Sequence, residues 1–383
     1  MSIQFCKKCI YPSTKPELQF NSQGICQGCI SYENRKTIDW QLRESQFKEM
    51  LKKAKKKNVE YDCVIPVSGG KDSIFQVIKV LECGYNPLCV TSTTDIFTSI
   101  GKENIEVLKK LGVDHFQIST DPVLRKKINK FTLKSVGDIS WAEHVTIYTI
   151  PTRIALNFNI PYVIWGENPN NDSGGPSWDE NSSKLTARWH NEFGGLLGLR
   201  TSDLIQEFDE PENKFNLYCY PSDEELLKKK IEGIFLGYFF QWDGNSNYEI
   251  AKKNGFLNYE KKELEGSLVN YENLDNAQMR VHDYFKYLKY GYDRVTDWCC
   301  WHIRRGRLSR NEALELNKEK SGKYPSSYMG YDLKEILADI DCTITEFNQI
   351  CDDFTNVEIF KCNNENKPVK TEDGSLILNH PYE

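Results

Sequence analysis

Residues 64–73 read Val64-Ile65-Pro66-Val67-Ser68-Gly69-Gly70-Lys71-Asp72-Ser73, and this stretch decides the fold. Its first four residues are apolar and predict a buried strand. The residues after it predict a helix, because apolar side chains recur at the spacing of one helix face: Ile74, Val77, Ile78 and Leu81. Two glycines in the turn let the backbone approach a ligand, and the free N–H groups that begin a helix favour an anion. The order strand, glycine turn, helix therefore predicts a phosphate site.

The turn differs from the Walker P-loop, which has four residues between its first glycine and Gly-Lys-Ser/Thr. The pattern S-G-G-x-D-S resembles the pyrophosphate loop (PP-loop) of the ATP pyrophosphatase superfamily, and a plain serine-glycine turn is the alternative. The resemblance implies cleavage of ATP between its α- and β-phosphates and adenylation of a carbonyl oxygen. Asp72 is either a Mg2+ ligand or a carboxylate favoured by the helix dipole. Lys71 is either a phosphate contact or an exposed helix lysine. The implied ATP-binding residues are Ser68, Gly69, Gly70, Asp72 and Ser73.

Length and composition are those of an ordinary globular enzyme. The 383 residues suffice for two or three domains, with 39% hydrophobic and 27% charged residues. The net charge of -6 argues against nucleic-acid binding. No apolar run reaches the length of about 18 residues that a membrane helix needs. The N-terminus lacks the apolar core of a signal peptide, so we expect a cytoplasmic enzyme without nucleic-acid or membrane partners.

Two cysteine pairs predict a metal site. Thirteen cysteines without a secretion signal favour metal binding or buried thiols over disulfides. The pairs Cys6-x-x-Cys9 and Cys26-x-x-Cys29 are sixteen residues apart, and four thiolates leave no open position on a zinc ion. We therefore expect a structural Zn2+ knuckle, with iron as the alternative. Gly24-Ile25-Cys26-Gln27-Gly28 also matches a glutaminase nucleophile elbow, but too little chain precedes it for the strand and domain that an elbow needs.

Apolar runs and helical patterns alternate downstream. We expect helices near 40–57, 72–84 and 102–111, and strands near 61–67, 88–91, 113–118, 162–165 and within 233–242. This alternation predicts an α/β fold, with a parallel sheet and helices on both faces. Ligands of such sheets bind beyond the carboxyl ends of the strands. Four strand ends should therefore meet at ATP: 68–73, 91–95, 119–121 and 166–172.

The ends of the later strands add candidate site residues. We expect Thr91 and Gly166 to lie beside ATP. Trp178 and His190, between two glycine pairs, are candidates for sugar contacts because aromatic rings stack on sugar faces, and a packed insertion is the alternative. The polar loop after the fourth strand either caps the next element or holds substrate, ammonia or magnesium. Together with Lys71 and Asp72, its candidate catalytic residues are Glu167, Asn168 and Asp172.

The chain is expected to divide into a zinc-binding knuckle (1–38), a PP-loop domain (39–245, with an insertion near 168–215) and a mostly helical C-terminal region (246–383). In that region a helix should start near Met279, Ser309 should cap another, and Thr343-x-x-Glu346 is a capping-box candidate. Arginine side chains suit carboxylates and phosphates, so a basic run there is either substrate-binding or a solvated helix face. Its members are Arg304, Arg305, Arg307 and Arg310.

From Cys6 to about Phe354 the chain resembles the bacterial N-acetyl sugar amidotransferases. The resemblance rests on Cys6-Lys7-Lys8-Cys9, Gly24-Ile25-Cys26, Leu236-Gly237-Tyr238, Trp242-Asp243, residues 249–256 and 270–275, His282-Asp283-Tyr284, Lys286–Gly291 and Ile303–Ala313. It implies synthesis of acetamidino sugars, such as derivatives of pseudaminic or legionaminic acid, for lipopolysaccharide, other surface polysaccharides or flagellin glycosylation. ATP would adenylate the N-acetyl carbonyl, and ammonia would then displace AMP.

Some features leave the substrate and the ammonia source open. Residues 298–302, Trp-Cys-Cys-Trp-His, are bulkier than the family pattern, and 168–215 match it poorly, so the sugar is not determined. Since the chain has no recognisable glutaminase domain, we expect a separate glutaminase subunit, or free ammonia as substrate.

Two other functions compete with this interpretation. One is a tRNA-thiolating PP-loop enzyme with a persulfide on Cys219, Cys299 or Cys300, which the acidic charge and the lack of an evident basic RNA-binding domain oppose. The other is a non-catalytic zinc-ribbon scaffold, which the intact glycine loop opposes.

Overall fold

The computed structural model describes residues 3–55, 60–168, 182–259, 264–372 and 374–382. Within these residues, a six-stranded sheet has the order β3-β2-β1-β4-β6-β5. Five strands are parallel, and β5 pairs antiparallel with β6 at one edge. The expected α/β fold with a parallel sheet is confirmed. The strands are β1 (Cys63–Pro66), β2 (Pro87–Ser92), β3 (Asp114–Ile118), β4 (Tyr162–Trp165), β5 (Lys184–Leu185) and β6 (Glu232–Phe235).

The first strand occupies the centre of the sheet. Val64 of β1 is level with Leu88 of β2 on one side and with Val163 of β4 on the other. The chain builds β2 and β3 on one side of β1 and then returns to build β4 on the other side. The order of strands therefore reverses between β1 and β4, and such a switch point leaves a crevice at the carboxyl ends of the two strands.

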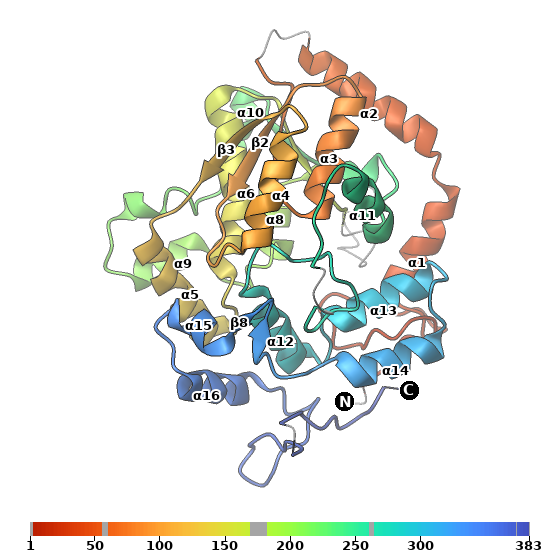
Figure 1. Ribbon diagram of the computed structural model, residues 1–383, viewed down its shortest axis with the longest axis vertical. Helices are drawn as coiled ribbons and strands as arrows, with labels where there is room; N and C mark the ends of the chain where they lie inside the picture. Colours follow the sequence, from red (N-terminus) through yellow and green to blue (C-terminus); the bar gives the residue numbers. More distant parts are fainter. Residues whose placement is uncertain (1–2, 56–59, 169–181, 260–263, 373, 383) are drawn as a thin grey trace.

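Helices cover both faces of the sheet (Figure 1). Neighbouring residues of a strand point to opposite faces, so Ile65 packs with one helical layer and Val64 with the other. The first layer contains α2 (Trp40–Lys55), α3 (Lys71–Glu82), α4 (Ser99–Lys109) and α11 (Gly244–Lys253). On the second face lies α6 (Trp141–Phe158), which buries Ile150, Ala155 and Leu156.

Local sequence signals placed several C-terminal elements correctly. Helix α12 is Met279–Tyr290. The Ser309 side chain accepts a hydrogen bond from the Glu312 N–H at the start of α14 (Arg310–Lys320). The Thr343 side chain accepts one from the Glu346 N–H at the start of α16 (Ile344–Phe354). Helix α13 (Arg294–Arg304) and the hairpin β7 (Ser327–Tyr328) and β8 (Tyr331–Asp332) were not expected. The remaining α-helices are α1 (Gln27–Asn34), α5 (Pro122–Val136), α8 (Ala187–Phe193), α9 (Thr201–Glu207), α10 (Asp223–Lys229) and α15 (Leu333–Ala338).

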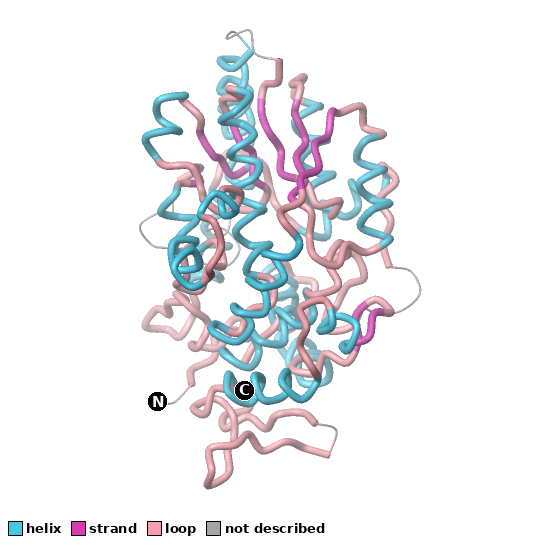
Figure 2. Tube along the Cα trace, turned by 90° about the vertical axis from the view of Figure 1, so that its left-hand side faces the viewer, coloured by secondary structure: helices cyan, strands magenta, loops and turns pink. Residues whose placement is uncertain are grey.

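The N-terminal segment packs on the C-terminal helices, below the sheet in both views (Figures 1 and 2). The Tyr11 hydroxyl donates a hydrogen bond of 2.7 Å to Asp297 of α13, and Thr14 donates one of 2.6 Å to the carbonyl of Tyr290. Residues of both segments share one apolar cluster. The domain boundaries expected at 38 and 245 stay predictions. Across the described parts of the chain, no helix combines the length and apolar character needed to cross a membrane.

Candidate active site

A cavity of about 370 Å³ lies at the carboxyl ends of β1, β2 and β4. Its volume falls in the range of small-molecule sites. Three of the four expected strand ends meet there, whereas the described lining contains none of residues 119–121, which follow the edge strand β3. The structure brings together eight of the predicted residues: Ser68, Gly70, Lys71, Asp72, Ser73, Thr91, Gly166 and Glu167.

Hydrogen bonds to serine hydroxyls hold the turn of the glycine loop. The backbone N–H of Ser68 donates to the Ser73 hydroxyl (3.1 Å), and that of Gly70 donates to the Ser68 hydroxyl (3.3 Å). Gly70 is the N-cap of α3, and no side chain accepts from the first turn of this helix. Because a capping side chain would compete for these N–H groups, the start of α3 remains suited to a phosphate.

Gly69 shapes the loop without lining the cavity. Its φ of +82° is a conformation that side chains oppose, and a Cβ there would lie 2.9 Å from the carbonyl oxygen of Gly101 in α4. Both the turn and the contact with α4 therefore require glycine.

Lys71 is buried, so its interpretation as an exposed helix lysine was wrong. Its Nζ lies 2.7 Å from Asp72 Oδ2 and 3.8 Å from Glu272 Oε1. Burial opposes its charge, but the carboxylates of Asp72, Glu272 and Glu167 outweigh burial and raise the pKa of Lys71. Asp72 Oδ1 also accepts a hydrogen bond of 2.8 Å from Asn247 of α11. Lys71 thus pairs with two carboxylates, one beside it in the chain and one 201 residues away.

Sequence reasoning missed the acidic wall of the cavity, which consists of Glu143 in α6 together with Glu272 and Asp275 before α12. Burial and the charges of Asp275 and Asp95 raise the pKa of Glu143 to about 7. Burial raises the pKa of Asp275 to about 6, against hydrogen bonds from its own backbone and from Ser68. The sequence did hold one signal for Glu272 and Asp275, because both lie in the stretch 270–275, which is part of the family resemblance.

Aromatic side chains form another part of the wall. Tyr148 of α6 stacks on Trp165 at a ring distance of 4.4 Å, and Trp189 of α8 packs nearby. His190, expected to contact a sugar, instead stacks on Tyr220 at 4.8 Å outside the cavity lining, and burial lowers the pKa of His190 to about 4. The histidine therefore belongs to the packed interior of the insertion.

The remaining candidates of the polar loop lie elsewhere. Asn168 is buried, and its amide donates a hydrogen bond of 3.3 Å to the carbonyl of Ser182, so it connects two segments rather than lining the cavity. Asp172 and Trp178 lie outside the described residues.

The predicted arginines do not line the main cavity. Arg304 lies against the cysteines, so its expected role in substrate binding was wrong: the last turn of α13 points it at the knuckle. Arg307 donates to Asp243 Oδ1 at 3.1 Å, and this ion pair also lies outside the cavity lining. Arg305 lines a smaller cavity of about 40 Å³, which shares Lys71 with the main one.

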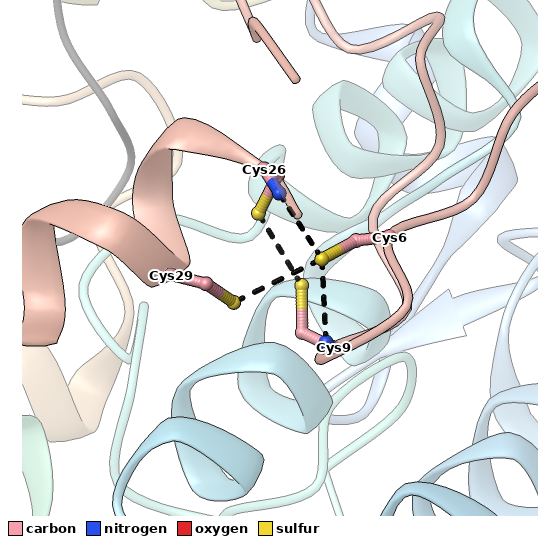
Figure 3. A group of neighbouring side chains, drawn as sticks. All are labelled: Cys6, Cys9, Cys26 and Cys29. Carbon is pink, nitrogen blue, oxygen red and sulfur yellow. Dashed lines mark hydrogen bonds between the residues drawn. The ribbon is translucent and has the colours of Figure 1, made fainter. Parts of the chain in front are cut away.

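The four cysteines form one buried cluster (Figure 3). Cys9 and Cys26 have sulfur atoms 3.6 Å apart, and those of Cys6 and Cys29 are 4.0 Å apart. Metal–sulfur bonds of about 2.3 Å in a tetrahedron separate sulfurs by roughly 3.8 Å, so these residues fit a tetrahedral ion. The Arg304 guanidinium contacts three of the sulfurs, with Nε 3.5 Å from Cys29 Sγ.

Comparisons with known proteins match part of the chain. Residues 254–372 match the family described as LPS biosynthesis protein WbpG-like, C-terminal domain. This segment contains α12 to α16 and supplies Glu272, Asp275 and Arg294 to the cavity. The uncharacterized protein MJ1599 of Methanocaldococcus jannaschii is 28% identical over 120 residues, which are 30% of this chain and 43% of that protein. The chain thus spans less than half of this curated relative.

Solved structures of low similarity were also found. NH3-dependent NAD synthetase from Campylobacter jejuni has a TM-score of 0.29 at 14% identity and covers 59% of this chain and 100% of its own. U34-tRNA thiolase NcsA from Methanococcus maripaludis, solved with a 4Fe-4S cluster, has a TM-score of 0.32 at 12% identity and covers 91% and 98%. TM-scores this low leave the fold assignment resting on the strand order and register described above.

Proposed function

We propose that this chain is an ATP-dependent, AMP-forming amidotransferase that converts the N-acetyl group of a sugar into an acetamidino group. The observation that carries the proposal is that two distant parts of the chain line the same cavity. The glycine loop Ser68–Ser73 forms one wall, and the WbpG-like segment forms another with Glu272 and Asp275. An ATP-binding loop would thus face residues of a domain type named for lipopolysaccharide biosynthesis.

The chemistry explains why such a cavity needs ATP. An amide carbonyl is a poor electrophile, and its oxygen is a poor leaving group. Attack of that oxygen on the α-phosphate would give an O-adenylyl imidate and pyrophosphate, and ammonia would then displace AMP. The protein contributes by positioning the reactants and stabilising charge. The N–H groups in the first turn of α3 and the hydroxyls of Ser68 and Ser73 would hold the departing pyrophosphate.

The charge of the cavity fits a nucleotide that arrives with Mg2+. Five carboxylates and two cations stand in the described lining: Asp72, Glu143, Glu167, Glu272 and Asp275, with Lys71 and Arg294. Such an acidic site would repel free ATP. Asp72 and Glu167 both line the cavity and would offer oxygen ligands to Mg2+, which prefers carboxylates together with substrate phosphates. When bound, the ion would neutralise charge on the leaving pyrophosphate.

The cysteine cluster would hold Zn2+ in a structural role, since four protein ligands leave no open position. Its place supports this assignment, because the cluster packs on α13, whereas the cavity lining contains no cysteine among the residues that the structure describes. The same observation opposes a tRNA thiolase. Among the described residues Cys299 and Cys300 are buried beside the knuckle and Cys219 follows α9, so none of them would present a persulfide to the adenylated atom.

The proposal is tested by incubating the purified chain with ATP, Mg2+ and ammonium chloride and a panel of N-acetylated nucleotide sugars and nonulosonic acids. We expect AMP and pyrophosphate, together with a product whose mass differs by the exchange of an oxygen atom for an NH group. Release of ADP and orthophosphate, or no sugar-dependent exchange of labelled pyrophosphate into ATP across the panel, would refute it.

We also propose that a separate glutaminase subunit supplies the ammonia. The purified chain should then use ammonium chloride but not glutamine. Turnover with glutamine alone would contradict this arrangement.

A further inference from the structure

Two acidic side chains of the cavity have no role in the scheme above. Glu143 stands in the first turn of α6, and Asp275 lies in the segment before α12, yet both line the same cavity, and the charge of Asp275 acts on Glu143. Both are held in place. The Asn276 amide donates a hydrogen bond to Glu143, and the Ser68 hydroxyl donates one to Asp275. A Cβ on Gly101 would lie 2.7 Å from the Asp275 Cα, so that glycine lets this segment approach α4.

The cations near Glu143 and Asp275 are paired with other carboxylates. Arg125 grips Asp95 with two hydrogen bonds, Nε to Oδ1 at 2.6 Å and Nη2 to Oδ2 at 3.1 Å. Lys71 forms ion pairs with Asp72 and Glu272. In the described part of the chain, neither Glu143 nor Asp275 forms an ion pair.

We infer that Glu143 and Asp275 form an ammonium-binding subsite that takes protons from the incoming nitrogen, an inference that rests on the proposed function. Ammonium is a small cation with N–H donors on every side, and two carboxylate acceptors beside the loop suit it. The residues around the pair that carry charge are Arg125 and His144, which favour the ionised form of Glu143, and Asp95, which opposes it.

The reaction releases two protons, and the subsite has two acceptors. Ammonium gives one proton to a carboxylate and becomes ammonia, whose electron pair forms the C–N bond to the adenylated carbon. The attacking nitrogen then gives a second proton to the other carboxylate. The C–O bond to the adenylyl group breaks, AMP leaves with the electron pair, and an amidinium cation remains. The raised pKa of Glu143, about 7, makes it a better proton acceptor than an ordinary carboxylate.

The first test needs no sugar. Thermal unfolding of the full chain is followed at neutral pH in ammonium chloride and in potassium chloride at equal concentrations, because potassium has a similar size but no N–H groups. We expect ammonium to raise Tm by about 2 °C more than potassium does. Glu143→Gln and Asp275→Asn should abolish the difference, whereas Glu106→Gln, at a surface pair with Lys109, should keep it. Equal effects of both salts on the wild type, or an unchanged difference in Glu143→Gln and Asp275→Asn, would overturn the inference.

The second test separates this inference from the proposed function. Sugar-dependent exchange of pyrophosphate into ATP reports adenylation, which needs no ammonia. Glu143→Gln should retain this exchange but lose about 100-fold in ammonium-dependent amidine formation. Equal loss of both reactions in this variant would contradict a role of Glu143 in the attack of ammonia. Absence of exchange in the wild type would refute the proposed function and leave the ammonium effect on Tm to stand by itself.

Discussion

The Arg304 guanidinium lies against the sulfur of Cys29, with Nε 3.5 Å from Sγ, at the point where α13 meets the N-terminal knuckle. Four thiolates around one divalent ion would carry a net negative charge, which this buried cation would offset. Gly28 makes room for the contact, because a Cβ there would lie 2.6 Å from Arg304 Nη2. The arginine thus connects the cysteine cluster to α13, which bears Trp298 next to Glu272.

Replacing Arg304 by glutamine should therefore weaken metal binding. Outer contacts of this kind are worth about 10- to 100-fold in affinity, and competition with a chromogenic chelator measures the change. Arg307→Gln, which breaks only the pair with Asp243, is the matched control. A metal affinity unchanged by Arg304→Gln would show that the guanidinium does not contribute to metal binding.

Loss of the metal itself should unfold the knuckle. Cys9→Ser removes one of the four ligands, so metal content should fall and residues 3–26 should gain hydrogen exchange, because binding free energy contributes to folding in such small sites. Cys83→Ser, outside the cluster, should behave as wild type. Full metal occupancy in Cys9→Ser would contradict the four-cysteine assignment.

Gly69 and Gly84 offer a matched pair of substitutions. Both have positive φ, +82° and +79°, but only Gly69 has close neighbours. An alanine should cost about 1 kcal/mol in unfolding free energy at Gly84 from backbone strain alone. Gly69→Ala should cost more and should lower pyrophosphate exchange by at least about 100-fold. Urea unfolding and the exchange assay measure the two effects, and equal costs at both sites would argue against the packing described for the loop.

Lys71 should matter for stability as well as for turnover. Lys71→Gln leaves the carboxylates of Asp72 and Glu272 without their shared cation, which should cost on the order of 3 kcal/mol in unfolding free energy. Lys79→Gln, on the exposed face of the same helix, breaks a surface pair with Glu82 and should cost less than about 1 kcal/mol. Similar midpoints for the two variants in urea would contradict the burial of Lys71.

The acidic pair predicts a pH dependence of stability. The pKa of Glu143 is raised to about 7 and that of Asp275 to about 6, above their unfolded values, so the folded state binds more protons. The contribution of these groups is therefore present at low pH and is lost as pH rises from about 4 to about 7. Relative to wild type, Glu143→Gln should gain Tm at about pH 8 and show little gain at about pH 4. A constant difference across this range would contradict the raised pKa.

Much of the part of the chain that contains the sheet could be predicted because its signals are local. The glycine loop follows its strand and precedes its helix, β4 coincides with the expected 162–165, and Ser309 and Thr343 cap helices within three residues. Helix α13 was not predicted, and its burial does not follow the division between polar and apolar residues, because Thr296, Asp297 and Arg304 are buried together with its apolar side chains.

The site residues that sequence reasoning missed depend on contacts between distant parts of the chain. Lys71 meets Glu272, and Glu143 meets Asn276, across separations of more than a hundred residues. No spacing rule relates such positions. Arg304 was misjudged for the same reason, since its partner Cys29 lies 275 residues away.

The seat of the knuckle on α13 and α14 has a consequence for biosynthesis. The Cys9 carbonyl accepts a hydrogen bond from Arg310, 301 residues later in the chain, and the Tyr11 hydroxyl donates one to Asp297, 286 residues later. Neither contact can form until the ribosome has made these partners. During that interval the cysteine thiols of the knuckle are exposed to oxidants and to competing metals. The sheet can form before the knuckle does. A nascent chain released before α13 is made would keep its glycine loop, but its N-terminal knuckle would have no helix to pack on.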